Sequence, residues 1–160
     1  MSQISERLKE LGYRKFIESD DYSSYKLKDL SELISRNIPE QFTFFLQEFP
    51  NTGIFDDFVD VVGLESAPWA PDKRYPITGM YANCSRSHLD IMKIRDGNGG
   101  AWDEFLMFGH DIMGGTYAID LRSEEFGKIK YKSTEEDWDG MINLIANDFF
   151  SFIFSIQLSN

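Results

Sequence analysis

Two histidine–aspartate pairs are the residues of this chain best suited to metal chemistry. His88 precedes Asp90 by two positions, and His110 is followed directly by Asp111. Two imidazoles and two carboxylates are an acceptable ligand set for zinc, provided that both segments lie on neighbouring strands. Each pair also stands near a turn, where histidine and aspartate commonly cap backbone groups. A metal-dependent hydrolase is therefore the least favoured interpretation, and we expect no metal and no other cofactor.

No other motif indicates catalysis. Cys84, the single cysteine, has no surrounding motif that marks it as a nucleophile, and no Gly-x-Ser-x-Gly elbow is present. The glycine-rich run 96–100 lacks the lysine of a phosphate-binding loop and the spaced carboxylates of an EF-hand, so we expect a hairpin turn there. A pair of facing carboxylates, as in a glycosidase, is not excluded by the sequence, but acidic residues are so abundant that they are a poor signal for such a site. We predict a protein that is not an enzyme.

Aromatic and acidic residues are better candidates, as parts of a protein-binding surface. The first group is Phe55 with Asp56, Asp57 and Asp60, the second is Trp69 in the proline-braced loop 67–71, and the third is Trp102 with Asp103 and Glu104. Aromatic anchors ringed by charge are typical of protein interfaces. A position in the core is at least equally expected for either tryptophan.

The charge of the chain restricts its partners. With 27 Asp and Glu residues against 16 Lys and Arg residues, the formal net charge is −11. An excess of carboxylates repels phosphate backbones and anionic lipid, so we expect no direct binding to nucleic acid or membrane. The same charge would steer a basic protein toward this surface. A net negative charge also keeps a protein soluble, and this is the more general explanation of the excess of acidic residues.

Apolar spacing predicts two helices in the first third of the chain. Residues 4–11 place Ile4 and Leu8 on one face and end at Gly12, and residues 13–20 could add a short element. A clearer helix has Pro39 at its first position, carries an apolar stripe at residues 42, 45, 46 and 49, and ends at residues 50–53. Residues 30–34 also carry apolar side chains at helical spacing.

The middle of the chain changes to the period of β-strands. Short strands are predicted at residues 58–62, 78–82, 89–95, 105–108, 116–121 and 128–132. The glycine-rich turns between them are too short for parallel crossovers, which favours antiparallel pairing. In the last of these strands Lys130 and Lys132 alternate with Ile129 and Tyr131, so one of its faces should be wet.

A buried helix is predicted over residues 143–158, which are apolar on nearly every side. Helices, then strands, then a helix indicate an α+β fold in one domain, residues 1–160. We predict a twisted antiparallel sheet of about five or six strands, flanked by N-terminal and C-terminal helices.

The compartment is predicted from what the chain lacks. One cysteine excludes an intrachain disulfide, and neither a signal-peptide pattern nor a bilayer-length apolar run is present. A cytoplasmic protein is the simplest expectation. We expect a monomer or a weak homodimer.

The order of three features resembles the SUKH superfamily, which contains bacterial toxin-immunity proteins and fungal cell-wall assembly regulators. They are the run 38–46 followed by Asn51-Thr52-Gly53, the strand pair with glycine turns at 105–109, 114–121 and 127–129, and the Ala-x-x-Phe pattern at 146–149. The match spans roughly residues 30–156; Thr52 interrupts the usual Asn-Gly, and residues 63–86 are hard to match. Most matching residues also have structural explanations, and Asp120 is expected to bond backbone amides in the turn that follows it.

This resemblance implies a SUKH-like α+β fold and protein binding without enzymatic activity. The leading hypothesis is an immunity protein of a toxin–antitoxin pair that neutralises a toxin domain, with a basic nuclease toxin as the partner. The alternative is a regulatory or scaffold domain related to the cell-wall assembly regulators.

Overall fold

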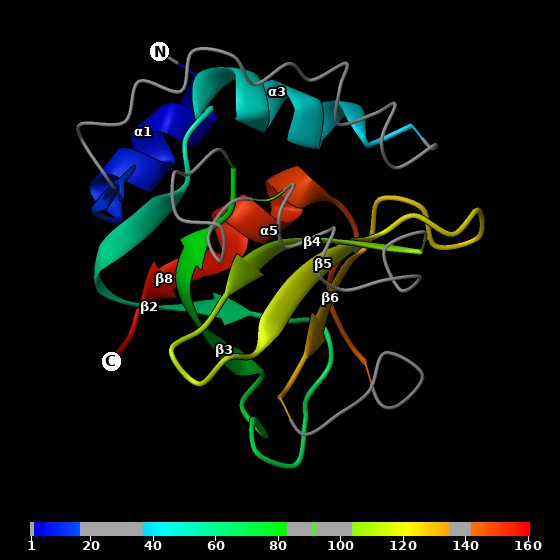
Figure 1. Ribbon diagram of the computed structural model, residues 1–160. Helices are drawn as coiled ribbons and strands as arrows, with labels where there is room; N and C mark the ends of the chain where they lie inside the picture. Colours follow the sequence, from blue (N-terminus) through cyan, green and yellow to red (C-terminus); the bar gives the residue numbers. More distant parts are fainter. Residues whose placement is uncertain (1, 17–36, 83–90, 92–103, 135–141) are drawn as a thin grey trace.

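The computed structural model describes residues 2–16, 37–82, 91, 104–134 and 142–160. Its helices lie together on one side of a strongly curved antiparallel sheet (Figure 1). The predicted α+β class is confirmed. Three earlier expectations fall outside these residues, or nearly so: the helical spacing at 30–34, the turn at 96–100, and the strand at 89–95, of which Ile91 alone is described.

Helix α1 (Gln3–Glu10) confirms the first predicted helix. Ile4 and Leu8 are buried on its inner face. The Ser2 hydroxyl caps its first turn by accepting a hydrogen bond from the Ser5 N–H at 3.2 Å. Gly12, just beyond its end, has a φ of +72°, a left-handed conformation that glycine adopts without steric cost. The chain can therefore reverse at once into the first strand.

Helix α3 (Glu40–Glu48) begins one residue later than predicted, because Pro39 lies in the extended region at the N-cap. The predicted apolar stripe is buried through Phe42, Phe45 and Leu46. After the helix, the Thr52 hydroxyl accepts a hydrogen bond from the Ala82 N–H at 2.8 Å. Thr52, the residue that interrupts the Asn-Gly pattern, thus links this corner to the end of the third strand.

In the described ranges the sheet has eight strands, more than the five or six that were predicted. They are β1 (Tyr13–Lys15), β2 (Gly53–Val62), β3 (Arg74–Met80), β4 (Phe105–His110), β5 (Thr116–Asp120), β6 (Ile129–Lys132), β7 (Asn143–Ala146) and β8 (Ile156–Leu158). Neighbours pair in the order β1 to β7, and β8 pairs with β2. The additional strands β1, β7 and β8 have three or four residues each, too few for an alternating pattern to be visible in the sequence.

Strand β6 behaves as its alternation predicts. Ile129 and Tyr131 are buried, whereas Lys130 and Lys132 remain partly exposed on the other face. At the β5–β6 turn, the Asp120 carboxylate accepts a hydrogen bond from the Arg122 N–H at 3.0 Å. The predicted role of Asp120 in this turn is confirmed.

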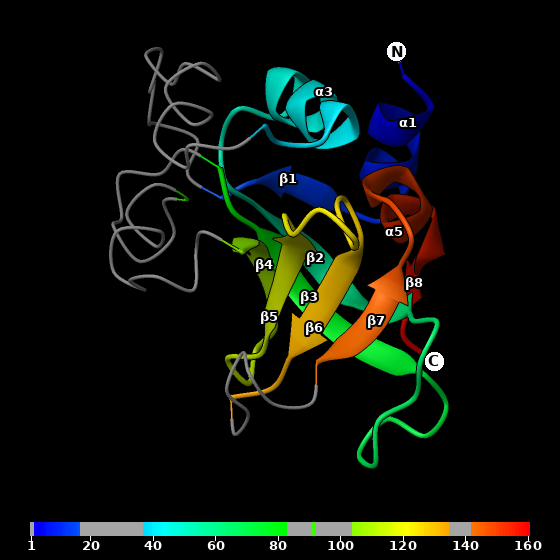
Figure 2. The same ribbon diagram turned by 90° about the vertical axis from the view of Figure 1, so that its right-hand side faces the viewer.

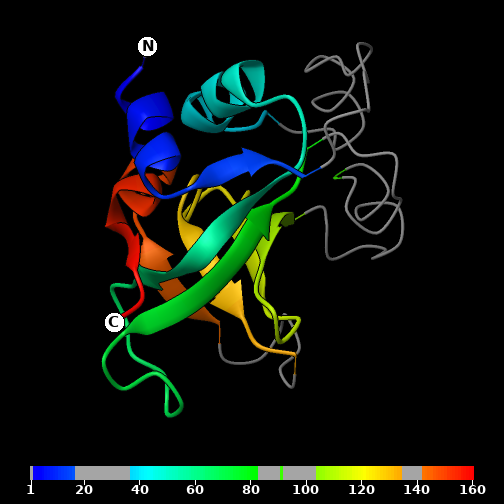
Figure 3. The ribbon, with the colours of Figure 1, turned by 90° about the vertical axis from the view of Figure 1, so that its left-hand side faces the viewer.

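The sheet curls until its two halves face each other. Figures 2 and 3 show β4 to β7 on one side of the molecule and β1 to β3 on the other. The chain that leaves β2 then meets β7, because the N–H groups of Leu64 and Glu65 donate to the carbonyls of Ile145 and Leu144, both at 3.1 Å. These bonds occupy the outer edge of β7 and so protect it from pairing with another chain.

The prediction of one helix over residues 143–158 is wrong. This run forms β7, then helix α5 (Phe149–Ser155), then β8. Asp148 starts α5 by accepting a hydrogen bond from the Ser151 N–H at 2.9 Å, and β8 pairs with β2 from Val59 to Val61. A segment that is apolar on all sides has no period, so pairing partners elsewhere in the chain decide its conformation.

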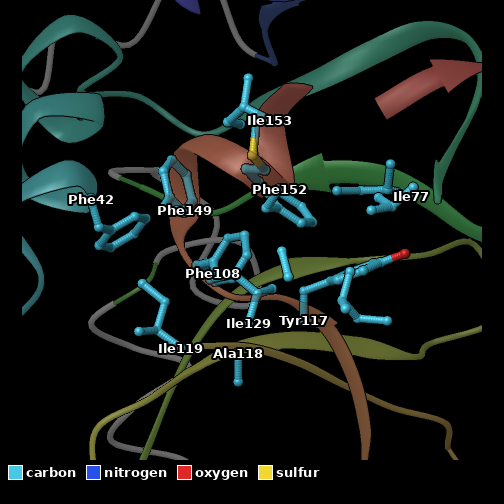
Figure 4. Packing of buried hydrophobic residues seen from close by; sticks show 14 of the residues in the cluster. Phe42, Ile77, Phe108, Tyr117, Ala118, Ile119, Ile129, Phe149, Phe152 and Ile153 are labelled. Carbon is cyan, nitrogen blue, oxygen red and sulfur yellow. The ribbon is translucent and has the colours of Figure 1, made fainter. Parts of the chain in front are cut away.

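The core joins all layers through aromatic rings. Phe149 and Phe152 of α5 point down onto Phe108 of β4, and Phe42 of α3 approaches from the side (Figure 4). The ring centroid of Phe108 lies 5.3 Å from that of Phe149, 5.2 Å from that of Phe152 and 5.7 Å from that of Phe42. Burying this much aromatic surface is the main source of stability for helices that are too short to be stable alone.

In the described parts of the chain, no helix combines the length and apolar character needed to cross a bilayer.

Candidate functional site

The candidate site begins at an irregularity in β2. Between two points of regular pairing, β2 advances five residues, from Ile54 to Val59, while β3 advances only from Gly79 to Ile77. The extra residues bulge out of the sheet, which breaks the in–out alternation and re-aims side chains. Asp56, Asp57 and Phe58 are consequently exposed in succession.

Residues far from β2 in the sequence hold the bulge in place. The Asp56 N–H donates to the Gly12 carbonyl at 3.1 Å, and the Phe58 carbonyl accepts from the Ser159 N–H at 2.9 Å. The Arg14 side chain of β1 donates to the Asp56 carboxylate at 2.5 Å, with both side chains about half exposed. The backbone of the bulge is therefore fixed although its side chains face solvent.

An acidic groove of about 300 Å³ lies against this bulge, lined by residues 55–60, 76–78, 112 and 159. The described residues of its lining include the three carboxylates of Asp56, Asp57 and Asp60 and no lysine or arginine. Phe58 is 83% exposed, and Ile112 on the opposite wall is 74% exposed. We call this cavity the acidic groove.

The β4–β5 loop presents the apolar wall of the groove. The Asp111 carboxylate is buried and accepts hydrogen bonds from the Met113 N–H at 2.7 Å, the Gly115 N–H at 2.9 Å and the Tyr131 hydroxyl. Gly114 has a φ of +86°, which closes the loop. Asp111 therefore caps backbone groups, the alternative to metal binding that its position near a turn suggested.

A second cavity, of about 450 Å³, lies on the other side of this loop, and we call it the aromatic pocket. Its walls include Trp69, Arg74, Asp111, Tyr131, Ser133 and Thr134. Trp69 is half exposed and packs against Tyr75 and Tyr131, at 5.2 and 5.4 Å between ring centroids. Two backbone hydrogen bonds between Ala67 and Ala70 close the turn that carries it. Trp69 is thus held in place with one side accessible.

The acidic groove and the aromatic pocket adjoin each other. Pro76 lines both, and the consecutive residues Ile112 and Met113 face one cavity each. Arg74, in the wall of the pocket, lies 3.7 Å from the carboxylate of Asp60 in the groove. The fold therefore brings together two groups that are far apart in the sequence, Asp56–Asp57–Asp60 and Trp69.

Of the remaining predicted site residues, Phe55 and Glu104 are described, and neither adds an exposed side chain to the groove or the pocket. Phe55 is buried, with its ring 5.0 Å from that of Tyr13, so its side chain is part of the core and not an exposed anchor. Glu104 precedes β4, at the end opposite to Asp111. Trp102 and Asp103 lie outside the described residues.

Sequence reasoning missed three contributors to this surface: Phe58 and Ile112 as exposed apolar residues, and Arg74. Two adjacent apolar residues between Asp111 and Gly114-Gly115 could have indicated an exposed apolar tip, since turn residues on both sides force the side chains outward. No local pattern marks Arg74.

Burial and the charge of Asp111 affect the tyrosines behind the site. Burial, with a smaller contribution from Asp111, raises the pKa of Tyr81 to about 12. The pKa of Tyr117 is raised well above its ordinary value, mainly by burial and to a smaller extent by Tyr131 and Asp111. The Tyr117 hydroxyl donates to the Pro76 carbonyl at 2.8 Å, where β3 diverges from β4. Both phenols therefore stay protonated at neutral pH, and the Tyr117 hydroxyl acts as a hydrogen-bond donor.

The proposed metal ligands are only partly described. His110 stacks on Tyr81, with ring centroids 4.8 Å apart, and His88 lies outside the described residues. Within the described ranges, no three His, Cys, Asp or Glu side chains are grouped closely enough to hold a metal ion.

A third cavity, of about 450 Å³, lies between α1, α3 and α5. Phe44, Phe150 and Phe154 line it together with Ile4, and Glu40 stands at its edge. Phe44 and Phe154 are exposed. It is mainly apolar and offers little charge by which a partner could be recognised.

Comparisons of the chain with protein-family models, with curated proteins and with solved structures found no match. The function must therefore be inferred from the residues and their geometry.

Proposed function

We propose that this chain is a non-enzymatic protein-binding module, an immunity protein of the SUKH type that neutralises a toxin domain. Its partner is a basic protein, such as a nuclease toxin, whose cationic surface is bound through the acidic groove. The order of the Pro-led helix, glycine turns and terminal Ala-x-x-Phe pattern supports the family assignment.

The observation that carries this proposal is the bulge of β2. It exposes two carboxylates and Phe58 in succession beside the exposed Ile112, in a groove where none of the described lining residues is a lysine or arginine. Exposed aromatic and aliphatic side chains supply contact area, and the surrounding carboxylates select a basic partner. The net charge of −11 adds long-range attraction for such a partner.

The test begins with the genes adjacent to that of this chain, among which the proposal requires a toxin-like reading frame. Its purified domain should bind this protein, and Asp57→Lys should weaken binding by about tenfold or more, chiefly by slowing association. Glu124→Lys is the matched control, because it makes the same charge change at an exposed site in the β5–β6 turn.

Binding would be measured by surface plasmon resonance at low and physiological salt, and neutralisation by survival of cells that express the toxin. Equal loss of affinity in both variants would show that total charge, and not the groove, attracts the partner. No binding to the neighbouring toxin domain would contradict the immunity function, and toxin-independent binding to a host protein would favour a regulatory domain.

A further inference from the structure

The aromatic pocket contains a buried negative charge that is not neutralised by an ion pair among the described residues. Asp111 is 3% exposed, and its three hydrogen-bond donors, two backbone N–H groups and the Tyr131 hydroxyl, are all uncharged. A carboxylate can accept about four hydrogen bonds, so this one retains capacity toward the cavity that it lines.

Among the described residues of the pocket wall, Arg74 is the one positive side chain, and its charge is already opposed. Its guanidinium lies 3.7 Å from Asp60, on the side of the acidic groove. Asp60, Arg74 and Asp111 together therefore leave one net negative charge at the boundary between the two cavities. Burial strengthens the attraction of this charge for a cation that enters.

Aromatic rings form another part of the pocket wall. Trp69 is 46% exposed and is held by Tyr75 and Tyr131, so its indole can stack on a flat ligand without rearrangement. Cations bind preferentially to the face of tryptophan, and a guanidinium group can both stack and donate hydrogen bonds. The Thr134 hydroxyl, also in the pocket wall, can accept a further hydrogen bond.

We propose that the aromatic pocket receives an arginine side chain of the partner protein, stacked on Trp69 with its charge directed to Asp111. This inference rests on the proposed function, since it assumes a basic protein partner. It assigns the acidic groove and the aromatic pocket different tasks: the groove attracts the partner, and the pocket anchors one side chain. A volume of about 450 Å³ is ample for one arginine side chain.

The pocket can be tested without the partner. The probe is N-acetyl-arginine methylamide, compared with the citrulline analogue, which has nearly the same shape and no charge. In ¹H–¹⁵N spectra the arginine probe should shift the Trp69 indole and the Gly115 and Thr134 amide signals in a saturable way, and the citrulline probe should not. Trp69→Phe assigns the indole signal.

Two variants locate the binding. Asp111→Asn should weaken the arginine probe at least fivefold, and Trp69→Leu should do the same by removing the stacking surface while leaving Asp111 and its loop in place. Asp57→Asn, in the acidic groove, is the control and should change the affinity less than twofold.

Equal binding of the citrulline probe, or no saturable shift up to the solubility limit of the arginine probe, would overturn the inference. Free arginine that binds tenfold more tightly than the capped probe would do so too, since the pocket would then serve a free amino acid. Failure of the probe while the toxin domain still binds through Asp57 would reject this inference alone. Binding of the probe, combined with no binding of the neighbouring toxin domain, would reject the proposed function and leave the pocket as an arginine-binding site.

Discussion

Asp111 has two roles in this molecule: it caps backbone groups of a loop, and it places a charge in the wall of a cavity. It orders the β4–β5 loop through Met113 and Gly115, and it faces the aromatic pocket. Its negative charge stabilises the neutral form of a nearby phenol relative to the phenolate, and therefore raises the pKa of Tyr81 in addition to the larger effect of burial.

Replacement of Asp111 by asparagine should lower the pKa of Tyr81 from about 12 toward its ordinary value of 10.0, because the charge is removed while burial stays. The measurement is an NMR titration of the ¹³C-labelled tyrosine rings, with Tyr81→Phe to assign the signal. Asp57→Asn should leave this pKa unchanged. A pKa that stays the same or rises in Asp111→Asn would contradict the proximity of the two groups.

At the scale of elements, short helices depend on their caps. Helix α5 has seven residues, and Asp148 begins it by accepting hydrogen bonds from the Ser151 N–H and hydroxyl, at 2.9 and 2.8 Å. Burial raises the pKa of Asp148, but these bonds and those of Gln41 and Phe150 outweigh it, so the pKa is lowered. The ionised cap is the form that the fold stabilises.

Asp148→Ala should reduce the free energy of unfolding by about 1 kcal/mol at about pH 7. Because the folded-state pKa is lowered, the stabilisation by Asp148 is present above the unfolded value of about 4 and is lost as pH falls through the folded value. Urea unfolding should therefore show a smaller difference from wild type at about pH 3. Asp148→Asn, which keeps a capping oxygen, should lose less stability than alanine. A difference that grows in acid would contradict this account.

At the scale of the whole molecule, one aromatic core packs the helices against the sheet. Phe152 of α5 contacts Phe108 of β4 and Tyr117 of β5, whereas Phe58 projects from the same sheet into solvent. The core sets stability, and the exposed aromatic is available for binding.

Phe152→Ala should destabilise the protein by about 3–5 kcal/mol, because it removes ring contacts and leaves a cavity, whereas Phe58→Ala should change stability by about 0.5 kcal/mol or less. Circular dichroism during urea unfolding should show helix and sheet signals that disappear together, since both layers share this core. A large loss of stability in Phe58→Ala would mean that its side chain is not exposed in solution.

Local patterns were sufficient where one face of an element is buried and the other is wet. The spacing of Ile4 and Leu8 predicts α1, the aromatic stripe predicts α3, and the lysine alternation predicts the two faces of β6. Asp120 was likewise assigned correctly to its turn, because the partner atoms are two residues away.

The candidate site could be predicted only in part. Asp56, Asp57, Asp60 and Trp69 were singled out by residue type, and the structure places them around two adjoining cavities. Phe55 was expected at the surface and lies in the core. The sequence could not show this, because the bulge that begins after Phe55 depends on the mismatch in pairing between β2 and β3.

The sequence by itself determined the acidic character, which depends on composition alone. It also determined the α+β class and the faces of the regular elements, because these follow from the spacing of apolar residues a few positions apart. Tertiary structure alone decided that residues 143–158 divide into β7, α5 and β8, and that Trp69 and Asp111 line the same pocket. The physical reason is that these features depend on strand pairing and ring packing between distant segments, which leave no periodic mark in the sequence.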